Sequence, residues 1–100
     1  MWGGLIIFNA VAIATPVTDY HRAWYLLQSS RPEQAAAIAT KVLTDDPGDP
    51  AAHRIYVRAL GTYLREYASV ERQYRAWLAE DEGDPVRRVA LAMLLEAGHR

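Results

Sequence analysis

The side chains that most often carry catalysis or bind metals are scattered along this chain rather than grouped. The three histidines, His21, His53 and His99, share none of the spacings that bring two ring nitrogens onto one metal ion. His53 stands four residues after an expected helix cap, so we interpret it as a partly buried structural histidine rather than a general base. No serine lies in a nucleophile-elbow motif, and the chain has no cysteine. We therefore expect no catalytic residue, no metal site and no cofactor.

Two groups of carboxylates are the remaining candidates for binding a cation. They are Asp45, Asp46 and Asp49, and then Glu80, Asp81, Glu82 and Asp84. A calcium loop needs oxygen ligands at alternating positions around a central glycine, and neither group has that spacing. Both groups stand where helices are expected to end and begin, so we interpret them as caps and solvated turns.

Composition limits the chain to a small set of function classes. Its 100 residues are enough for one small domain, and about half of them are apolar, so a core can be filled. The formal net charge is −1, which argues against a dedicated nucleic-acid or anionic-membrane binder. With no catalytic constellation present, a small stand-alone enzyme is disfavoured.

The elements that position these side chains are marked by a recurring cap. A side chain that accepts backbone N–H bonds, followed by proline, is typical of the start of a helix. This pair occurs as Thr15–Pro16, Asp49–Pro50 and Asp84–Pro85, with a preceding glycine in the last two cases. The prolines are 34 and 35 residues apart. A constant period with two helices in each interval is typical of helical repeat proteins.

The punctuation predicts five helices and no strand, because period-two alternation and hairpin turns are missing. The expected ranges are 16–28, 32–46, 50 to about 64, a segment within 65–82, and 85–98. The end of the third helix is marked only by Gly61 and Thr62 and by the turn propensity around Arg65, which makes that boundary soft. We predict an all-α fold of paired helices.

The second helices of the two intervals carry matching stripes. Ala35, Ala39 and Val42 align with Val70, Tyr74 and Trp77, at i, i+4 and i+7 on one helix face. In this pattern, with Pro47 after the first stripe, the chain resembles the tetratricopeptide repeat family. It departs from the family pattern at Ala39, Trp77 and Glu82, where an aromatic, a small residue and a proline are usual. The resemblance implies about two and a half helical hairpins within a domain of residues 15–100.

That resemblance also implies a concave groove on the first helix of each hairpin. The positions that would line it are Tyr20, Trp24, Arg54, Arg58, Val89 and Met93. It implies an interaction module, an adaptor or assembly subunit, that binds a peptide or partner helix carrying acidic and apolar residues. Two alternatives stay open: the arginines are solvated or paired with Glu66 or the acidic turns, and the chain is a fragment or non-catalytic subunit of a larger complex.

The fifth expected helix contains the sequence VALAMLLEAG, which is apolar on most sides. One neighbouring helix cannot cover all of these residues. The excess indicates a partner, a second copy of the chain bound through residues 85–97, or a further helix downstream.

Residues 1–14 form an apolar segment that is too short to span a bilayer, which takes about 20 apolar residues. Ala12-Ile13-Ala14 fits the small-x-small pattern of a signal-peptide cleavage site, but no Lys or Arg precedes the apolar run. Three interpretations remain: a signal peptide with a clipped start, an apolar helix packed on the domain or on a membrane, and a disordered leader. The first makes export slightly favoured over the cytoplasm.

Overall fold

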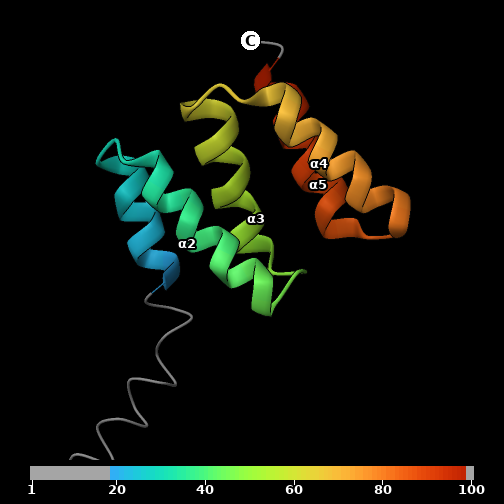
Figure 1. Cartoon of the computed structure of the whole chain (residues 1–100), viewed down its shortest axis with the longest axis horizontal. Helices are drawn as coiled ribbons and strands as arrows, with labels where there is room; N and C mark the ends of the chain where they lie inside the picture. Colours follow the sequence, from blue (N-terminus) through green and yellow to red (C-terminus); the bar gives the residue numbers. More distant parts are fainter. Residues whose placement is uncertain (1–18, 99–100) are drawn as a thin grey trace, which may run out of the picture.

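The computed structural model describes residues 19–98, which are all-helical and contain no strand. The apolar segment 1–14 and His99 therefore lie outside the described residues. The elements are a helix over residues 19–28, α2 (Pro32–Asp45), α3 (Pro50–Val57), the π-helix η1 (Arg58–Tyr63), α4 (Tyr67–Glu80) and α5 (Pro85–Gly98) (Figure 1). None of these helices is long and apolar enough to cross a membrane. The prediction of an all-α fold is confirmed.

The repeated Gly-Asp-Pro sequence begins α3 and α5 as expected. The Asp49 carboxylate accepts from the backbone N–H groups of Ala51 and Ala52, at 2.9 and 3.3 Å. The Asp84 carboxylate accepts from the second and third residues of α5, at 3.0 and 3.3 Å. Each aspartate thus pairs two N–H groups that the first helical turn leaves without partners, and the proline between them has no N–H to satisfy.

The third helix ends at Tyr63, close to its predicted end near residue 64. It does not break at Gly61 and Thr62 but continues through Tyr63 as the π-helix η1. The chain turns at Arg65, which has a left-handed φ of 62°. The helix is closed by wide hydrogen bonds, in which Leu64 N–H donates to the Ala59 carbonyl at 3.1 Å. Backbone bonds over five residues thus carry the helix past Gly61 and Thr62, the residues that made this boundary soft in the sequence.

Sequence spacing explains why a π-helix occurs at this point. Pro16 and Pro50 are 34 residues apart, whereas the two left-handed residues that end the corresponding helices, Ser30 and Arg65, are 35 apart. The second interval therefore holds one more residue between its proline and its left-handed turn. A π turn takes up one extra residue without breaking the helix, and η1 lies within this stretch.

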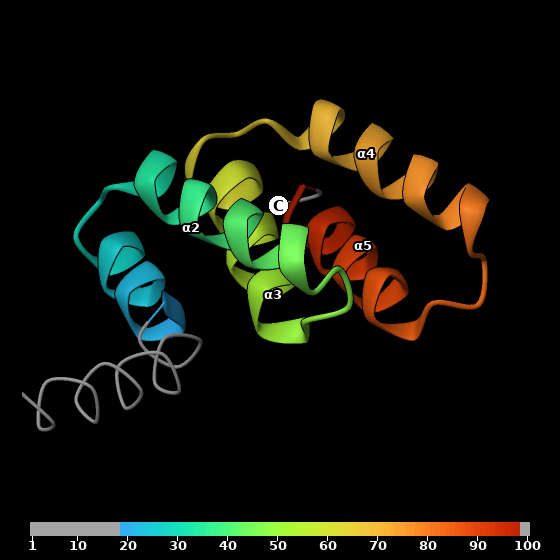
Figure 2. The ribbon, with the colours of Figure 1, turned by 60° about the horizontal axis from the view of Figure 1, so that its bottom comes forward.

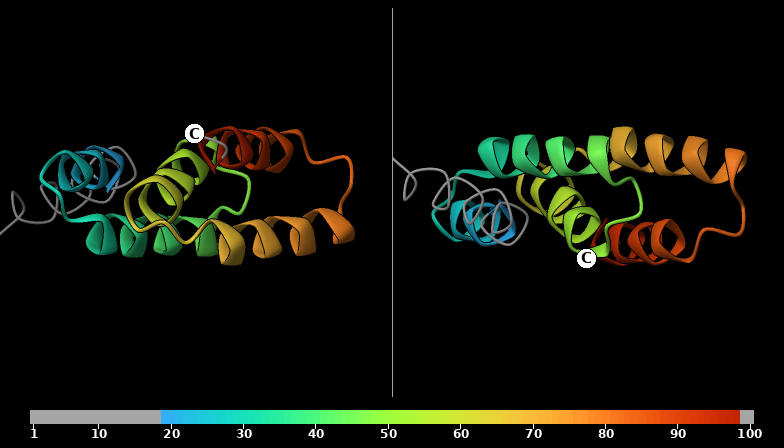
Figure 3. Two further views of the ribbon diagram at one scale, coloured as in Figure 1. Left: turned by 90° about the horizontal axis from the view of Figure 1, so that it is seen from above. Right: turned by 90° about the horizontal axis from the view of Figure 1, so that it is seen from below.

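The helices form two layers. The helix over residues 19–28, α3 and α5 lie in one layer, and α2 and α4 lie in the other (Figure 3). Between the layers, α2 packs against α3 and η1, while α4 packs against α5 and η1 (Figure 2). Since α3 also packs against α5, the α3–η1 helix is the central element of the described chain.

Two hydrophobic clusters fill the space between the layers. The first contains Ala23, Leu26, Leu27, Ala35, Ala36, Ala39, Ile55 and Ala59, and the second contains Val57, Val70, Tyr74, Ala90 and Leu94. Tyr56 and Leu60 of the central helix pack against both. Residues that align between the stripes of the two second helices are buried to the same extent. Ala35 and Val70 are 0% and 2% exposed, and Ala39 and Tyr74 are 2% and 0% exposed.

Part of the apolar surface of α5 is covered within the described residues. Ala90 and Leu94 are buried, because α3 and α4 pack on different sides of this helix. Leu91, Met93 and Leu95 are half-buried, and Val89 stays 60% exposed. Apolar surface on α5 therefore remains exposed at Val89 and Ala92, and in part at Leu91, Met93 and Leu95.

Gly61 allows the close approach of η1 to α5. A Cβ atom at this position would lie 2.7 Å from Cδ1 of Leu94 and 3.7 Å from the Tyr67 ring. The first distance is shorter than a carbon–carbon contact allows, and Leu94 is only 1% exposed, so it has little space into which to move. A side chain at position 61 would therefore push η1 and α5 apart.

Candidate functional site: the groove between α3 and α5

Two open hollows lie on one face of the molecule, where α3 and η1 pack beside α5. The first has a volume of about 260 Å³ and is lined by Pro50, His53, Arg54, Pro85, Val86, Val89, Ala90 and Met93. The second has a volume of about 200 Å³ and is lined by Val57, Arg58, Thr62, Met93, Glu96 and Ala97. Met93 lines both, so the hollows follow one another along the two helices. We refer to them together as the α3–α5 groove.

Five of the six residues that the sequence assigned to a groove are connected here. Arg54 and Val89 share the first hollow with Met93, and Arg58 shares the second with Met93. Trp24 joins them from the neighbouring helix, because the Arg58 guanidinium carbon lies 5.3 Å from the centroid of the Trp24 ring. This cation–π contact holds the Arg58 side chain against the first helix of the layer.

Tyr20, the sixth predicted residue, does not line the groove. It lies half-buried beside a small hollow between the helix over residues 19–28, α2 and α3, and its side chain packs against the first hydrophobic cluster. The resemblance placed Tyr20 and Trp24 together because they are one turn apart. In the structure only Trp24 reaches an arginine of the groove.

The residues that sequence reasoning missed continue the same helical stripes. Thr62 follows Arg58 by four residues, and Ala97 follows Met93 by four. Val86 and Ala90 precede Val89 and Met93 by three residues each. Since residues three and four apart share a helix face, this spacing was the signal that could have found them.

The two walls of the groove differ in chemistry. Arg54 and Arg58 on the α3 side are both exposed and cationic, whereas Val89 and Met93 on the α5 side are apolar. Arginine ion pairs within residues 19–98 join Asp19 to Arg22, Glu71 to Arg75 and Asp84 to Arg87. Neither groove arginine is therefore paired with Glu66 or with the acidic turns. The charge of Arg54 faces solvent beside an apolar hollow.

Behind the first hollow, a buried hydrogen-bond chain joins α3 to α4. His53 is 1% exposed; its Nε2 lies 2.7 Å from the Pro47 carbonyl oxygen, and its Nδ1 lies 2.7 Å from the Tyr74 hydroxyl. A carbonyl can only accept, so Nε2 carries the proton. In the neutral ring, Nδ1 must then accept from the Tyr74 O–H. Both nitrogens are occupied, and neither is open to a ligand in the groove.

The electrostatics of this chain favour the uncharged forms of both residues. Burial lowers the pKa of His53 and the nearby Arg87 cation lowers it further, while the Pro47 carbonyl, Asp84 and Asp49 act in the opposite direction. Burial also raises the pKa of Tyr74, with a smaller contribution from Tyr56. His53 is thus held neutral in the core, in agreement with its interpretation as a structural histidine.

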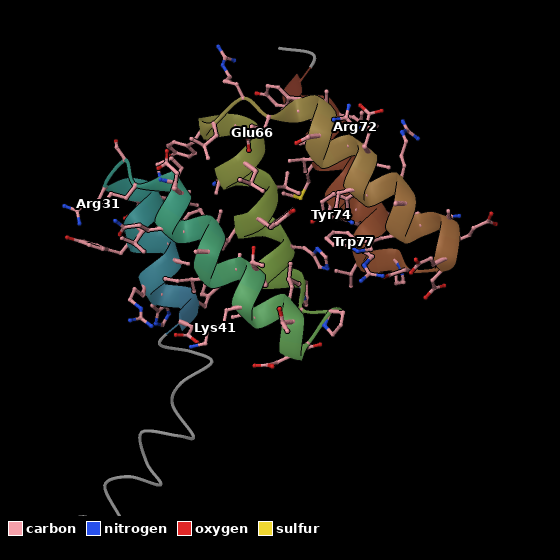
Figure 4. All side chains as sticks on the ribbon, in the orientation of Figure 1. Arg31, Lys41, Glu66, Arg72, Tyr74 and Trp77 are labelled. Atoms are coloured by element: carbon pink, nitrogen blue, oxygen red, sulfur yellow. The ribbon has the colours of Figure 1, made fainter. Side chains whose placement is uncertain are left out.

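Aromatic side chains surround this buried pair. The Tyr74 and Trp77 rings meet edge to face at 5.0 Å, and both point from α4 toward α3 (Figure 4). The Arg87 guanidinium carbon lies 4.9 Å from the centroid of the Trp77 ring, and its Nε is 3.5 Å from an Asp84 oxygen. These contacts make a rigid floor for the first hollow, since His53 itself forms part of the lining.

Within residues 19–98, no group of three or more histidine or acidic side chains is arranged to hold a metal ion. The Asp46 carboxylate instead accepts from Gly48 N–H at 3.3 Å, and Asp49 and Asp84 cap helices. Comparison with protein-family models, curated proteins and solved structures gives no match to this chain. The class is thus defined by the fold and the groove alone: an all-α protein with an open groove that has two arginines on one wall and mainly apolar residues on the other.

Proposed function

We propose that this chain is a protein–protein interaction module that binds a segment of a partner in the α3–α5 groove. We also propose that its helices form hairpin repeats of the tetratricopeptide type, which the matching burial of Ala35 with Val70 and Ala39 with Tyr74 supports. The observation that carries the function is that Arg54, Val89 and Met93 line one open hollow.

The physical basis for binding is burial of apolar surface at a preformed site. Val89 is 60% exposed and Met93 is half-buried beside it, so a partner side chain would remove apolar area from water at both. The groove lies between packed helices with a rigid floor, which keeps the cost of ordering it on binding small. The exposed arginines orient the partner through charge-assisted hydrogen bonds.

Selection from a random dodecapeptide library displayed on yeast tests this function. We expect the chain to enrich peptides whose binding is lost in Val89→Glu, which places a charge in the groove at an exposed position. Ala76→Glu is the matched control, because Ala76 is exposed on α4 in the other layer. Enriched peptides that bind Val89→Glu as well as wild type, or a failure to enrich any peptide, would contradict the proposal.

A further inference from the structure

We propose that the bound segment is extended and alternates acidic with aliphatic residues. Its carboxylates face Arg54 and Arg58, and its aliphatic side chains enter the hollows beside Val89 and Met93. This inference rests on the proposed function and specifies the chemistry of the partner. It follows from the charge, the spacing and the size of the groove, each of which is independent of the others.

Beside the first hollow, the two walls of the groove differ in charge. The α3 wall presents two exposed guanidinium groups, Arg54 and Arg58, and Arg54 has no ion pair among residues 19–98. The α5 wall opposite presents Val89 and Met93 at the first hollow, and Glu96 at the far end of the second. Carboxylates match guanidinium groups in geometry as well as in charge. A complementary segment therefore needs acidic groups on one side and apolar groups on the other.

The spacing of the wall residues fits an extended chain. Arg54 and Arg58 are four helical residues apart, as are Val89 and Met93, which corresponds to about 6 Å along each helix. Alternate residues of an extended segment point the same way and are about 6.6 Å apart. Side chains at i and i+2 can thus reach both arginines, while those at i+1 and i+3 point to Val89 and Met93.

The size of the hollows favours side chains over a whole helix. Their volumes of about 260 and 200 Å³ lie below the roughly 300–1,000 Å³ typical of small-molecule sites. A helix with its side chains is about 10–12 Å across and would rest above the groove rather than enter it. An extended segment can place one side chain in each hollow.

The groove limits the number of acidic residues. The basic wall offers two arginines, Arg54 and Arg58, and Glu96 lines the far end of the second hollow. We therefore expect two acidic residues in the bound stretch, one for each arginine.

The test uses acetylated, amidated and fluorescently labelled peptides, so that carboxylates come from side chains alone. The probe is Gly-Ala-Asp-Leu-Asp-Leu-Ala-Gly. One control groups the same residues as Gly-Ala-Asp-Asp-Leu-Leu-Ala-Gly, a second replaces both aspartates with asparagine, and a third replaces them with lysine. Affinities are measured by fluorescence anisotropy against wild type, Arg54→Glu and the control Arg72→Glu, which makes the same charge change at an exposed site on α4.

We expect the alternating acidic probe to bind wild type at least about tenfold more tightly than the grouped and asparagine peptides. Arg54→Glu should lose about tenfold for this probe and gain affinity for the lysine peptide, while Arg72→Glu should behave as wild type. Equal binding of the grouped peptide, or an unchanged affinity of Arg54→Glu, would overturn the inference. Display-selected peptides that need Val89 but tolerate Arg54→Glu would also overturn it and leave the proposed function standing.

Discussion

The imidazole of His53 and the hydroxyl of Tyr74 meet at 2.7 Å in the core, across the interface of α3 and α4. The partner of the other ring nitrogen, the Pro47 carbonyl, comes from the turn before α3, so the His53 ring joins its own helix to that turn and to α4. Breaking this chain of bonds leaves a buried polar group without a partner, which is costly because water cannot replace the lost bond.

Stability should depend on pH through His53. Its pKa is lowered in the folded protein, mainly by burial, whereas the unfolded chain keeps the ordinary value of 6.5. Below pH 6.5 the unfolded state therefore binds more protons, and the free energy of unfolding falls with decreasing pH until the folded pKa is reached. Above pH 6.5 this contribution is fully present. We expect a slope of up to about 1.4 kcal/mol per pH unit in this window.

Urea denaturation at half-unit steps from pH 5 to 8, together with an NMR titration of the His53 ring, measures this dependence. The matched variant is His53→Gln, which keeps a polar side chain but cannot titrate. The unfolding free energy of this variant should depend less steeply on pH, because the contribution of His53 is missing. A slope identical to that of wild type would show that another group is responsible.

Removal of the Tyr74 hydroxyl should destabilise the protein more than its size suggests. Tyr74→Phe keeps the ring contacts with Trp77 and Tyr56 but leaves Nδ1 of His53 without a donor. We expect a loss of about 1–3 kcal/mol in the free energy of unfolding. Tyr56→Phe is the control, since the half-buried Tyr56 hydroxyl makes no hydrogen bond to a described residue, and it should change stability by less than about 0.5 kcal/mol. Equal effects of the two variants would contradict the role given to the hydrogen bond.

The helix caps should each contribute measurably. Asp49→Ala removes the acceptor of two N–H groups at the start of α3 and should cost about 1 kcal/mol in unfolding free energy. Asp49→Asn retains a side-chain oxygen and should recover most of this loss. Asp45→Ala, in the last turn of α2 and exposed, should stay within about 0.5 kcal/mol of wild type. A neutral result for Asp49→Ala in the same denaturation experiment would contradict the cap.

These caps also show which parts of the fold could be predicted from the sequence. A cap and the proline after it are local, so Asp49–Pro50 and Asp84–Pro85 predicted the starts of α3 and α5 from neighbouring residues alone. The matching stripes on the second helices were readable too, because burial follows helical periodicity. The all-α class follows from these two signals.

Features that depend on contacts between distant parts of the chain could not be predicted from the sequence. The end of the third helix near residue 64 was predicted, but the reason that position 61 is a glycine lies in Leu94 of α5, which no local pattern indicates. Likewise, His53 and Tyr74 are 21 residues apart, and no local pattern links them. The position of Tyr20 depends on how its helix turns against α2 and α3, which helix periodicity alone does not set.

The contact of Gly61 with Leu94 gives the last prediction. In an ordinary helix, replacing glycine with a larger residue is neutral or favourable, since glycine is a poor helix former. Here Gly61→Val should instead lower the free energy of unfolding by about 1–3 kcal/mol, because its side chain must occupy space that Cδ1 of Leu94 fills. Leu94→Ala alone should cost about 2–5 kcal/mol through the cavity that it leaves in the core.

In the double variant, the valine at position 61 fills part of that cavity. The double variant should therefore lose less unfolding free energy than the sum of the two single losses. Urea denaturation of the four proteins measures this coupling energy. Strict additivity would mean that η1 and α5 do not approach each other as closely as the structure has them, and Gly48→Val, at a turn with open space around it, controls for the loss of a glycine alone.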